Sequence, residues 1–382
     1  MKTIYLDNNA TTTVDPRVVD RMIASYRAAY ANPASPHELG REARHALEQS
    51  REHIAELLGT QLHGEGSSRL IFTSGATESN NLAMLGITGP KPKRILISAI
   101  EHPSIVGPAE FAAQRGCRLE HIQVTPDGVI DLGHAEHLLA EHADLVSVML
   151  GNNETGVIQP IEPLAALCAR HNVPMHTDAV QTIGKLKVNF DDLGVRAMSG
   201  SAHKFHGPDG IGFLLLSGDA KLHPLMHGGF HQAGARPGTE SLVLAAGLET
   251  ALQNWSDEHP RREQQMTSLR VELETLISQA VPDLVIVGSN APRLPHTSSL
   301  AFPGIDRQAL LMALDLEGVA CSTGSACASG SSDPSPVLIA MGLDRSVVGG
   351  ALRFSLSAMT TRREILEAAR RISHVVARLQ GF

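Results

Sequence analysis

One stretch of the chain, residues 196–216, reads RAMSGSAHKFHGPDGIGFLLL. It begins with an expected strand at 196–199 and ends with an apolar strand at 211–216, and a lysine and a Gly/Pro turn lie between them. Similar short apolar runs recur upstream, separated by connections of helix length. This alternation indicates βαβ units and therefore an α/β fold with a largely parallel, buried sheet. The upstream strands are expected at 70–72, 95–97, 119–124, 145–150 and 174–176.

Helices are expected near both ends of the chain. Asp15-Pro16 and Ser35-Pro36 each join an N-cap residue to a proline at the first helical position, which predicts two helices in the opening section. A polar helical stretch at 257–278 precedes a last section. That section has strands near Val285, at 298–302 and at 352–356, and a closing helix that starts at Thr361.

The composition excludes several classes of protein. Of the 382 residues, 42% are hydrophobic, so the chain is neither disordered nor fibrous. Aromatic residues make up 3% and the net charge is −8, which argues against direct nucleic-acid binding. No apolar run reaches the ~18 residues of a membrane span, and the first residues lack a signal-peptide pattern. Four scattered cysteines without a C-x-x-C pair indicate reduced thiols and a cytoplasmic protein.

Histidines are frequent and raise the question of a metal. His223, His227 and His231 have the spacing of one helix face, but Pro224 and the glycines at 228–229 favour a loop. Because no carboxylate or cysteine cluster accompanies them, no metal site is expected.

Lys204 and Asp178 each follow an expected strand. A lysine flanked by small residues suits a Schiff-base lysine, although a surface lysine is the simpler interpretation of Lys204 alone. Asp178 lies where open α/β sheets bind ligands. Pyridoxal phosphate (PLP) needs an anion against its ring nitrogen, and Asp178 fits, while Gln181 can donate to the phenolic oxygen. An N-cap and a helix-surface residue are the alternatives for these two positions.

Three further strand ends carry polar residues. The run FTSGATESNN at 72–81 turns through glycine into a helix, where free N–H groups and the Thr77 hydroxyl would hold a phosphate. His102 could stack on a pyridine ring and transfer protons, or could be a capping or core histidine. Asn153 could orient substrate and cofactor, or merely build the turn.

Two residues of the last section complete the set. Cys327 lies among small polar residues at 321–330, which is unlike a packed core cysteine and indicates a functional thiol. Arg353 is a charge inside an apolar strand. A clamp on a substrate carboxylate explains it, and a buried ion pair is the alternative.

In this order, the segments closely resemble the cysteine desulfurases of the class V aminotransferase fold. The resemblance extends from YLDNNATT at 5–12 to the final helix. It implies the fold of type I PLP-dependent transferases: a large domain with a mainly parallel seven-stranded sheet flanked by helices, and a smaller α/β C-terminal domain. The expected division is a segment 1–14 that contributes to the small domain, a PLP-binding domain at 15–256, and a small domain at 257–382 with the cysteine loop.

The resemblance also implies a role for each candidate residue. Lys204 would attach PLP as a Schiff base, Asp178 would pair with the ring nitrogen, and Gln181 would bind the phenolic oxygen. His102 would lie over the ring as a catalytic residue, and Cys327 would accept sulfur from L-cysteine. The phosphate would be bound by Ala76, Thr77, Ser201 and His203. Asn153 would contact cofactor and substrate, and Arg353 would bind the substrate carboxylate. Thr239 would reach the phosphate of the other subunit of a homodimer.

Two departures from the family pattern affect these expectations. The usual glycine triplet reads Gly228-Gly229-Phe230, which alters the expected substrate entrance. The chain ends at Phe382, before the longer tail with which some relatives dock a scaffold protein. The alternatives are a selenocysteine lyase or an aminotransferase of the same fold, and a zinc or redox-sensing protein. A catalytically inactive interaction partner is a third, but it predicts the loss of Lys204 or Asp178, and both are present. The persulfide would pass to an acceptor protein for iron–sulfur cluster assembly, tRNA thiolation or DNA phosphorothioation.

Overall fold

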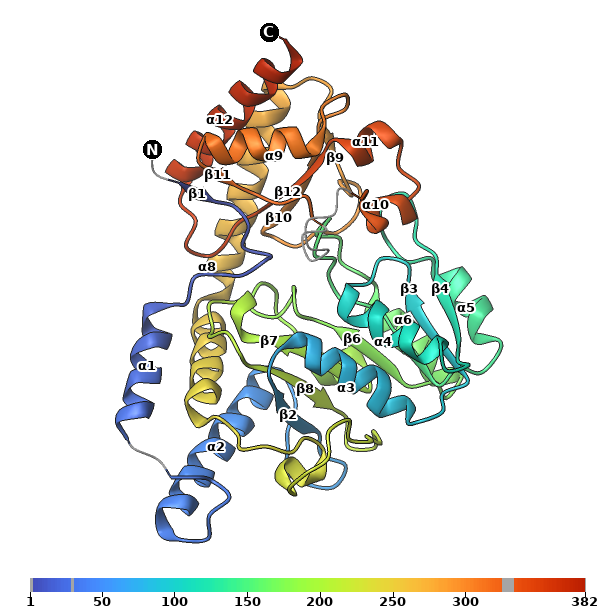
Figure 1. Ribbon diagram of the computed structural model, residues 1–382, viewed down its shortest axis with the longest axis vertical. Coiled ribbons are helices and arrows are strands. Elements are labelled where there is room, and N and C mark those ends of the chain that lie inside the picture. Colours follow the sequence, from blue (N-terminus) through green and yellow to red (C-terminus); the bar gives the residue numbers. More distant parts are fainter. Residues whose placement is uncertain (1–2, 29–30, 325–332, 382) are drawn as a thin grey trace.

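The computed structural model describes residues 3–28, 31–324 and 333–381 (Figure 1). Its centre is a seven-stranded sheet with the strand order β2-β8-β7-β6-β5-β3-β4. β8 is antiparallel to β2 and β7, and the other neighbouring strands pair in parallel, so the sheet is mainly parallel, as predicted. The strands are β2 (Arg69–Thr73), β3 (Arg94–Ser98), β4 (Arg118–Ile122), β5 (Leu145–Ser147), β6 (Met175–Asp178), β7 (Ala197–Ser201) and β8 (Gly212–Leu216).

The orientation of each strand follows from the length of its connection. The connection from β7 to β8 covers only residues 202–211, which is too short for a parallel crossover, so β8 returns antiparallel. The long connections carry helices that cover the sheet. These are α3 (Ala76–Thr88), α4 (Pro103–Ala113), α5 (Leu132–Leu139), α6 (Ile161–Arg170) and the short α7 (Phe190–Leu193).

Two strands are shorter than the sequence predicts. β4 ends at Ile122 rather than at residue 124, and β5 ends at Ser147 rather than at residue 150. Beyond β5, the N–H groups of Val148 and Leu150 still donate to the carbonyls of His176 and Asp178. The chain therefore stays beside β6 up to the loop that carries Asn153.

The longest helix, α8 (Leu242–Ala280), runs alongside both parts of the molecule (Figure 1). It begins at Leu242, well before the predicted residue 257, because the Ser241 side chain caps its start. The N-terminal part of α8 packs on α1 (Pro16–Arg27) and α2 (Glu38–Leu57), and its C-terminal part packs on α12 (Arg362–Gln380). The predicted domain boundary at 256/257 falls inside this continuous helix.

A second, smaller sheet lies beyond the central one and has the antiparallel order β12-β10-β9. Its core also takes in Ile4 and Leu6, because β1 pairs with β11. The N-terminal segment therefore packs on this part of the molecule. The elements here are β1 (Ile4–Tyr5), β9 (Val285–Ile286), β10 (Thr297–Ala301), α9 (Arg307–Leu316), β11 (Val319–Ala320), α10 (Pro336–Ala340), α11 (Arg345–Gly349) and β12 (Ala351–Ser355).

Candidate active site

A cavity of about 460 Å³ lies at the carboxyl ends of the central strands, next to the start of α3. This is the edge at which open α/β sheets bind ligands. Nine residues proposed from the sequence line it: Ala76, Thr77, His102, Asn153, Asp178, Gln181, Ser201, His203 and Lys204.

Asp178 is the last residue of β6 and is buried. Its Oδ2 accepts a hydrogen bond from Asn80 Nδ2 at 2.7 Å, and its Oδ1 accepts from the Val180 N–H at 3.0 Å. These two hydrogen bonds fix the orientation of the carboxylate. The cavity therefore has a fixed anion on its wall.

His102 both caps a helix and lines the cavity. Its Nδ1 accepts from the Ser104 N–H at 3.1 Å at the start of α4, and lies 2.7 Å from the Ser104 hydroxyl. Burial lowers the pKa of His102, and the positive charges of Lys204 and Arg353 act in the same direction, against Asp178. The ring is therefore neutral near pH 7.

Lys204 ends a short 3₁₀ helix, η1 (Ala202–Lys204), which follows β7. Its Nζ donates to the carbonyl oxygens of Asn9 at 2.7 Å and Ala10 at 2.8 Å. The neighbouring His203 has its Nδ1 3.2 Å from the Thr11 hydroxyl. Burial, together with the charge of Lys204, lowers the pKa of His203 to about 4. The N-terminal segment thus crosses the mouth of the site, which the motifs did not indicate.

The start of α3 forms one end of the cavity. Gly75 is the N-cap residue with φ of +152°, and it has no side chain that could cap the first N–H groups of the helix. Hydroxyls of Thr77 and Ser201 and the ring of His203 line the same cavity. Uncapped N–H groups and hydroxyls at one end, with a buried carboxylate on the wall, are a donor and acceptor set that fits PLP.

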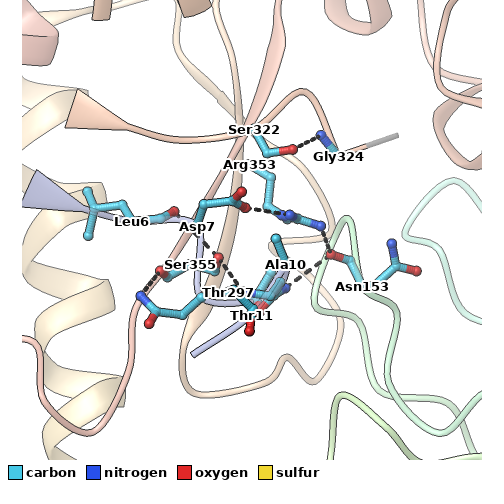
Figure 2. A network of polar contacts seen from close by, with 12 residues as sticks. Leu6, Asp7, Ala10, Thr11, Asn153, Thr297, Ser322, Gly324, Arg353 and Ser355 are labelled. Atoms are coloured by element: carbon cyan, nitrogen blue, oxygen red, sulfur yellow. Dashed lines mark hydrogen bonds and ion pairs between the residues drawn. The ribbon is translucent and has the colours of Figure 1, made fainter. Parts of the chain in front are cut away.

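Arg353 lies outside the cavity lining, in a buried polar network (Figure 2). Its Nη2 pairs with Asp7 Oδ1 at 2.6 Å, and its Nη1 donates to the Asn153 carbonyl at 2.9 Å. The structure thus shows the buried ion pair that was the alternative for this residue. Binding of a substrate carboxylate by Arg353 stays a prediction.

Two of the expected positions lie away from the cavity. Thr239 is exposed on the loop before α8 and does not line the chain's own cavity, while Phe230 is 87% exposed on the same loop. Cys327 lies outside the described residues. Burial raises the pKa of the other nearby thiol, Cys321, to about 12, so Cys321 is a poor source of thiolate.

Sequence reasoning missed several residues that support the site. Asn80 and Ser104 connect Asp178 to His102, and Asn9 accepts from Lys204. Glu101 is buried, where its Oε1 accepts from the Ser98 hydroxyl and the Met149 N–H, and burial raises its pKa to about 8. One signal in the sequence could have identified Asn80: it is a polar residue on the buried face of a helix.

Neither a metal cluster nor a membrane helix is found in the described ranges. Among those residues, no group of three or more His, Cys, Asp or Glu side chains is placed to hold a metal ion. No helix in the same part of the chain is long and apolar enough to cross a membrane.

Comparison with known proteins identifies the family. The sequence model of the class V aminotransferase family matches residues 4–367 of this chain. The chain belongs to this family. A cysteine desulfurase from Enterobacter agglomerans is 38% identical over 100% of this chain and 94% of its own length. The crystal structure of a NifS-like protein from Rickettsia africae superposes with a TM-score of 0.88 at 33% identity, covering 98% of this chain and 99% of that one. A structure described as SspA in complex with cysteine has a TM-score of 0.81 at 30% identity, and covers 94% and 100%.

Proposed function

We propose that the cavity binds PLP and L-cysteine, and that Cys327 receives the sulfur. As a cysteine desulfurase, the chain removes sulfur from L-cysteine and releases L-alanine. The observation that carries the proposal is the convergence of Lys204, Asp178 and His102, from three separate strand–helix junctions, on one cavity of about 460 Å³.

The cofactor would be held at three points. Lys204 would attach it covalently, Asp178 would keep its ring nitrogen protonated, and the start of α3 would bind its phosphate together with Ser201 and His203. Gln181 would face the phenolic oxygen, although its Nε2 donates to the Asn9 carbonyl at 3.0 Å in this structure. Bound PLP supplies an electron sink for the charge that develops at the substrate Cα.

Residues of the chain itself would transfer the proton and orient the substrate. With the cofactor and substrate bound, Lys204 would be the base that takes the Cα proton and later returns a proton. Asn153 and Arg353 orient the substrate carboxylate. Arg353 would act next to Asn153, whose carbonyl already accepts from its Nη1 at 2.9 Å.

The sulfur step requires a thiolate. The Cys327 thiolate attacks the substrate sulfur, the new S–S bond forms, and the Cβ–S bond breaks with its electron pair left on Cβ. Protonation of Cβ gives alanine, and the persulfide stays on Cys327 for delivery to an acceptor protein. An aminotransferase would not need this thiol. The exposed position of Thr239 is what a homodimer requires, in which Thr239 reaches the partner's cofactor.

The purified protein, incubated with L-cysteine, is expected to form alanine and to gain one sulfur atom on Cys327 in mass spectra. Cys327→Ser should bind L-cysteine but form no protein persulfide. Cys321→Ser is the matched control and should keep most of the activity. Sulfur mapped to Cys321, or full desulfuration by Cys327→Ser without added thiol, would overturn the assignment of the nucleophile.

A further inference from the structure

Asn80 links Asp178 to His102 through the hydroxyl of Ser104. It lies on α3 and is fully buried. Its Nδ2 donates to Asp178 Oδ2 at 2.7 Å and to Ser104 Oγ at 2.8 Å. A carboxylate oxygen only accepts hydrogen bonds, so the nitrogen of the amide must face Asp178. The Asn80 Oδ1 has no partner within the described residues, so the amide is held through its nitrogen alone.

The positions of the protons follow from these contacts. Ser104 Oγ accepts from Asn80 and keeps its single proton available for His102 Nδ1, 2.7 Å away. The Ser104 N–H donates to the same nitrogen at 3.1 Å. Nδ1 therefore accepts two hydrogen bonds, and the proton of the neutral ring must lie on Nε2.

We propose that Asn80 and Ser104 are positioning residues that fix His102 as the Nε2–H tautomer, so that it offers a hydrogen-bond donor to the ligand in the cavity. The tautomer itself rests only on the hydrogen bonds above. Its consequence for catalysis rests on the proposed function. Since Nδ1 is used by Ser104, Nε2 is the ring nitrogen left for a ligand. A ring in this state does not accept a proton at Nε2, which leaves the Cα proton to Lys204.

The same contacts oppose protonation of the ring. A proton on Nδ1 would break the bond from the Ser104 N–H and would force the hydroxyl to turn away. The charged groups that act on the ring are Asp178 from β6, Lys204 from η1 and Arg353 from β12. Of these three groups, Asp178 is the one that favours the protonated ring, and Oδ2 of its carboxylate already accepts a hydrogen bond from Asn80.

Nitrogen NMR of the full-length protein, labelled with ¹⁵N in histidine, tests the tautomer without any assay of turnover. The His102 signal is assigned by its loss in His102→Gln. We expect Nδ1 to be unprotonated and Nε2 protonated at pH 7. In Asn80→Ala, the Ser104 hydroxyl loses the donor that orients it and can turn to accept from the ring, so Nδ1–H should be populated and the ring should titrate at higher pH. Asn81→Ala is the matched control, because its amide donates to the Thr77 carbonyl of its own helix, and its spectrum should not change.

Kinetics then measure the effect on the reaction. Asn80→Ala is expected to lower kcat by up to about 100-fold, with little change in KM, and to move the acid limb of the pH profile upward. Ser104→Ala keeps the backbone bond to Nδ1, so it should give a smaller change in the same direction; it also provides the test if Asn80→Ala does not fold. A wild-type ring protonated on Nδ1, or a tautomer unchanged in both folded variants, would overturn the proposal. If the Nε2–H tautomer is found but the wild type does not desulfurate cysteine, the proposed function fails and the tautomer assignment stands.

Discussion

At the scale of single residues, two lysines compete for the role of cofactor lysine. Lys185 is buried, burial lowers its pKa well below the usual value, and its Nζ has no hydrogen-bond partner in the described part of the chain. By reactivity alone it would be the better nucleophile. However, Lys185 does not line the cavity, whereas Lys204 does. Position therefore favours Lys204.

Lys204→Ala is expected to abolish covalent cofactor attachment and turnover. After treatment with borohydride, the intact mass of the wild type should increase by one reduced cofactor, and that of the variant should not. Lys185→Met, which replaces the buried amine by an apolar chain of similar length, should still gain the mass. Attachment in Lys204→Ala and its loss in Lys185→Met would reverse the assignment.

Glu101 makes folding stability depend on pH. Burial raises its pKa from 4.5 to about 8. Between these values the folded state keeps a proton that the unfolded state releases, so this contribution is fully present below pH 4.5 and is lost as the pH rises toward 8. The slope is at most about 1.4 kcal/mol per pH unit.

Glu101→Gln should remove that slope, because the amide oxygen can still accept from Ser98 and Met149. Relative to wild type, the variant is expected to gain stability from pH 5 to pH 8, measured by denaturant unfolding at each pH. The exposed Glu65→Gln serves as the control and should run parallel to wild type. Parallel curves for Glu101→Gln as well would show that Glu101 is ionised in the folded protein.

At the scale of elements, Glu154 contacts the chain on both sides of segment 325–332, which carries Cys327. Its Oε2 accepts from the Ser335 hydroxyl at 2.6 Å, at the N-cap of α10. On the other side, a Cβ added to Gly324 would lie 3.0 Å from the same oxygen. Gly324 also has a φ of +86°, which glycine alone adopts without strain.

Gly324→Ala is therefore expected to slow persulfide formation while cofactor binding stays the same. The added methyl group strains the backbone by roughly 1–2 kcal/mol and presses on Glu154. Gly304→Ala is a closely matched control, since Gly304 has a φ of +84° but open space around its Cβ position. Persulfide formation is followed by mass spectrometry after a short pulse of L-cysteine. Equal rates for the two variants would exclude a role for the Glu154 contact.

At the scale of the whole molecule, Arg353 joins segments that lie far apart in sequence (Figure 2). Through Asp7 it holds the N-terminal segment, and through the Asn153 carbonyl it holds the loop after β5. Its own backbone pairs with Ser322, which leads toward the cysteine segment. The central sheet, the second sheet and the N-terminus thus meet at one buried guanidinium.

Asp7→Ala should destabilise the protein by about 3–5 kcal/mol, because it leaves a buried charge without its partner. The loss is expected as a lower melting temperature and as reduced activity, since the N-terminal segment also carries the carbonyls that bind Lys204. Asp283→Ala, at an exposed carboxylate, should change neither. An unchanged melting temperature for Asp7→Ala would indicate that the pair does not hold the segments together.

Local patterns in the sequence predicted the strands of the α/β sheet and the positions of Lys204, Asp178 and His102. They could do so because apolar runs and strand-end motifs lie within a few neighbouring residues, and because PLP chemistry demands particular side chains. The tertiary structure alone decided two other features: the passage of Asn9 and Ala10 over Lys204, and the bond from Asn80 to Asp178. Asp7 and Arg353 are 346 residues apart, and no local pattern encodes such a contact. It depends on how whole elements pack, which places the half-buried Asp7 against the buried Arg353.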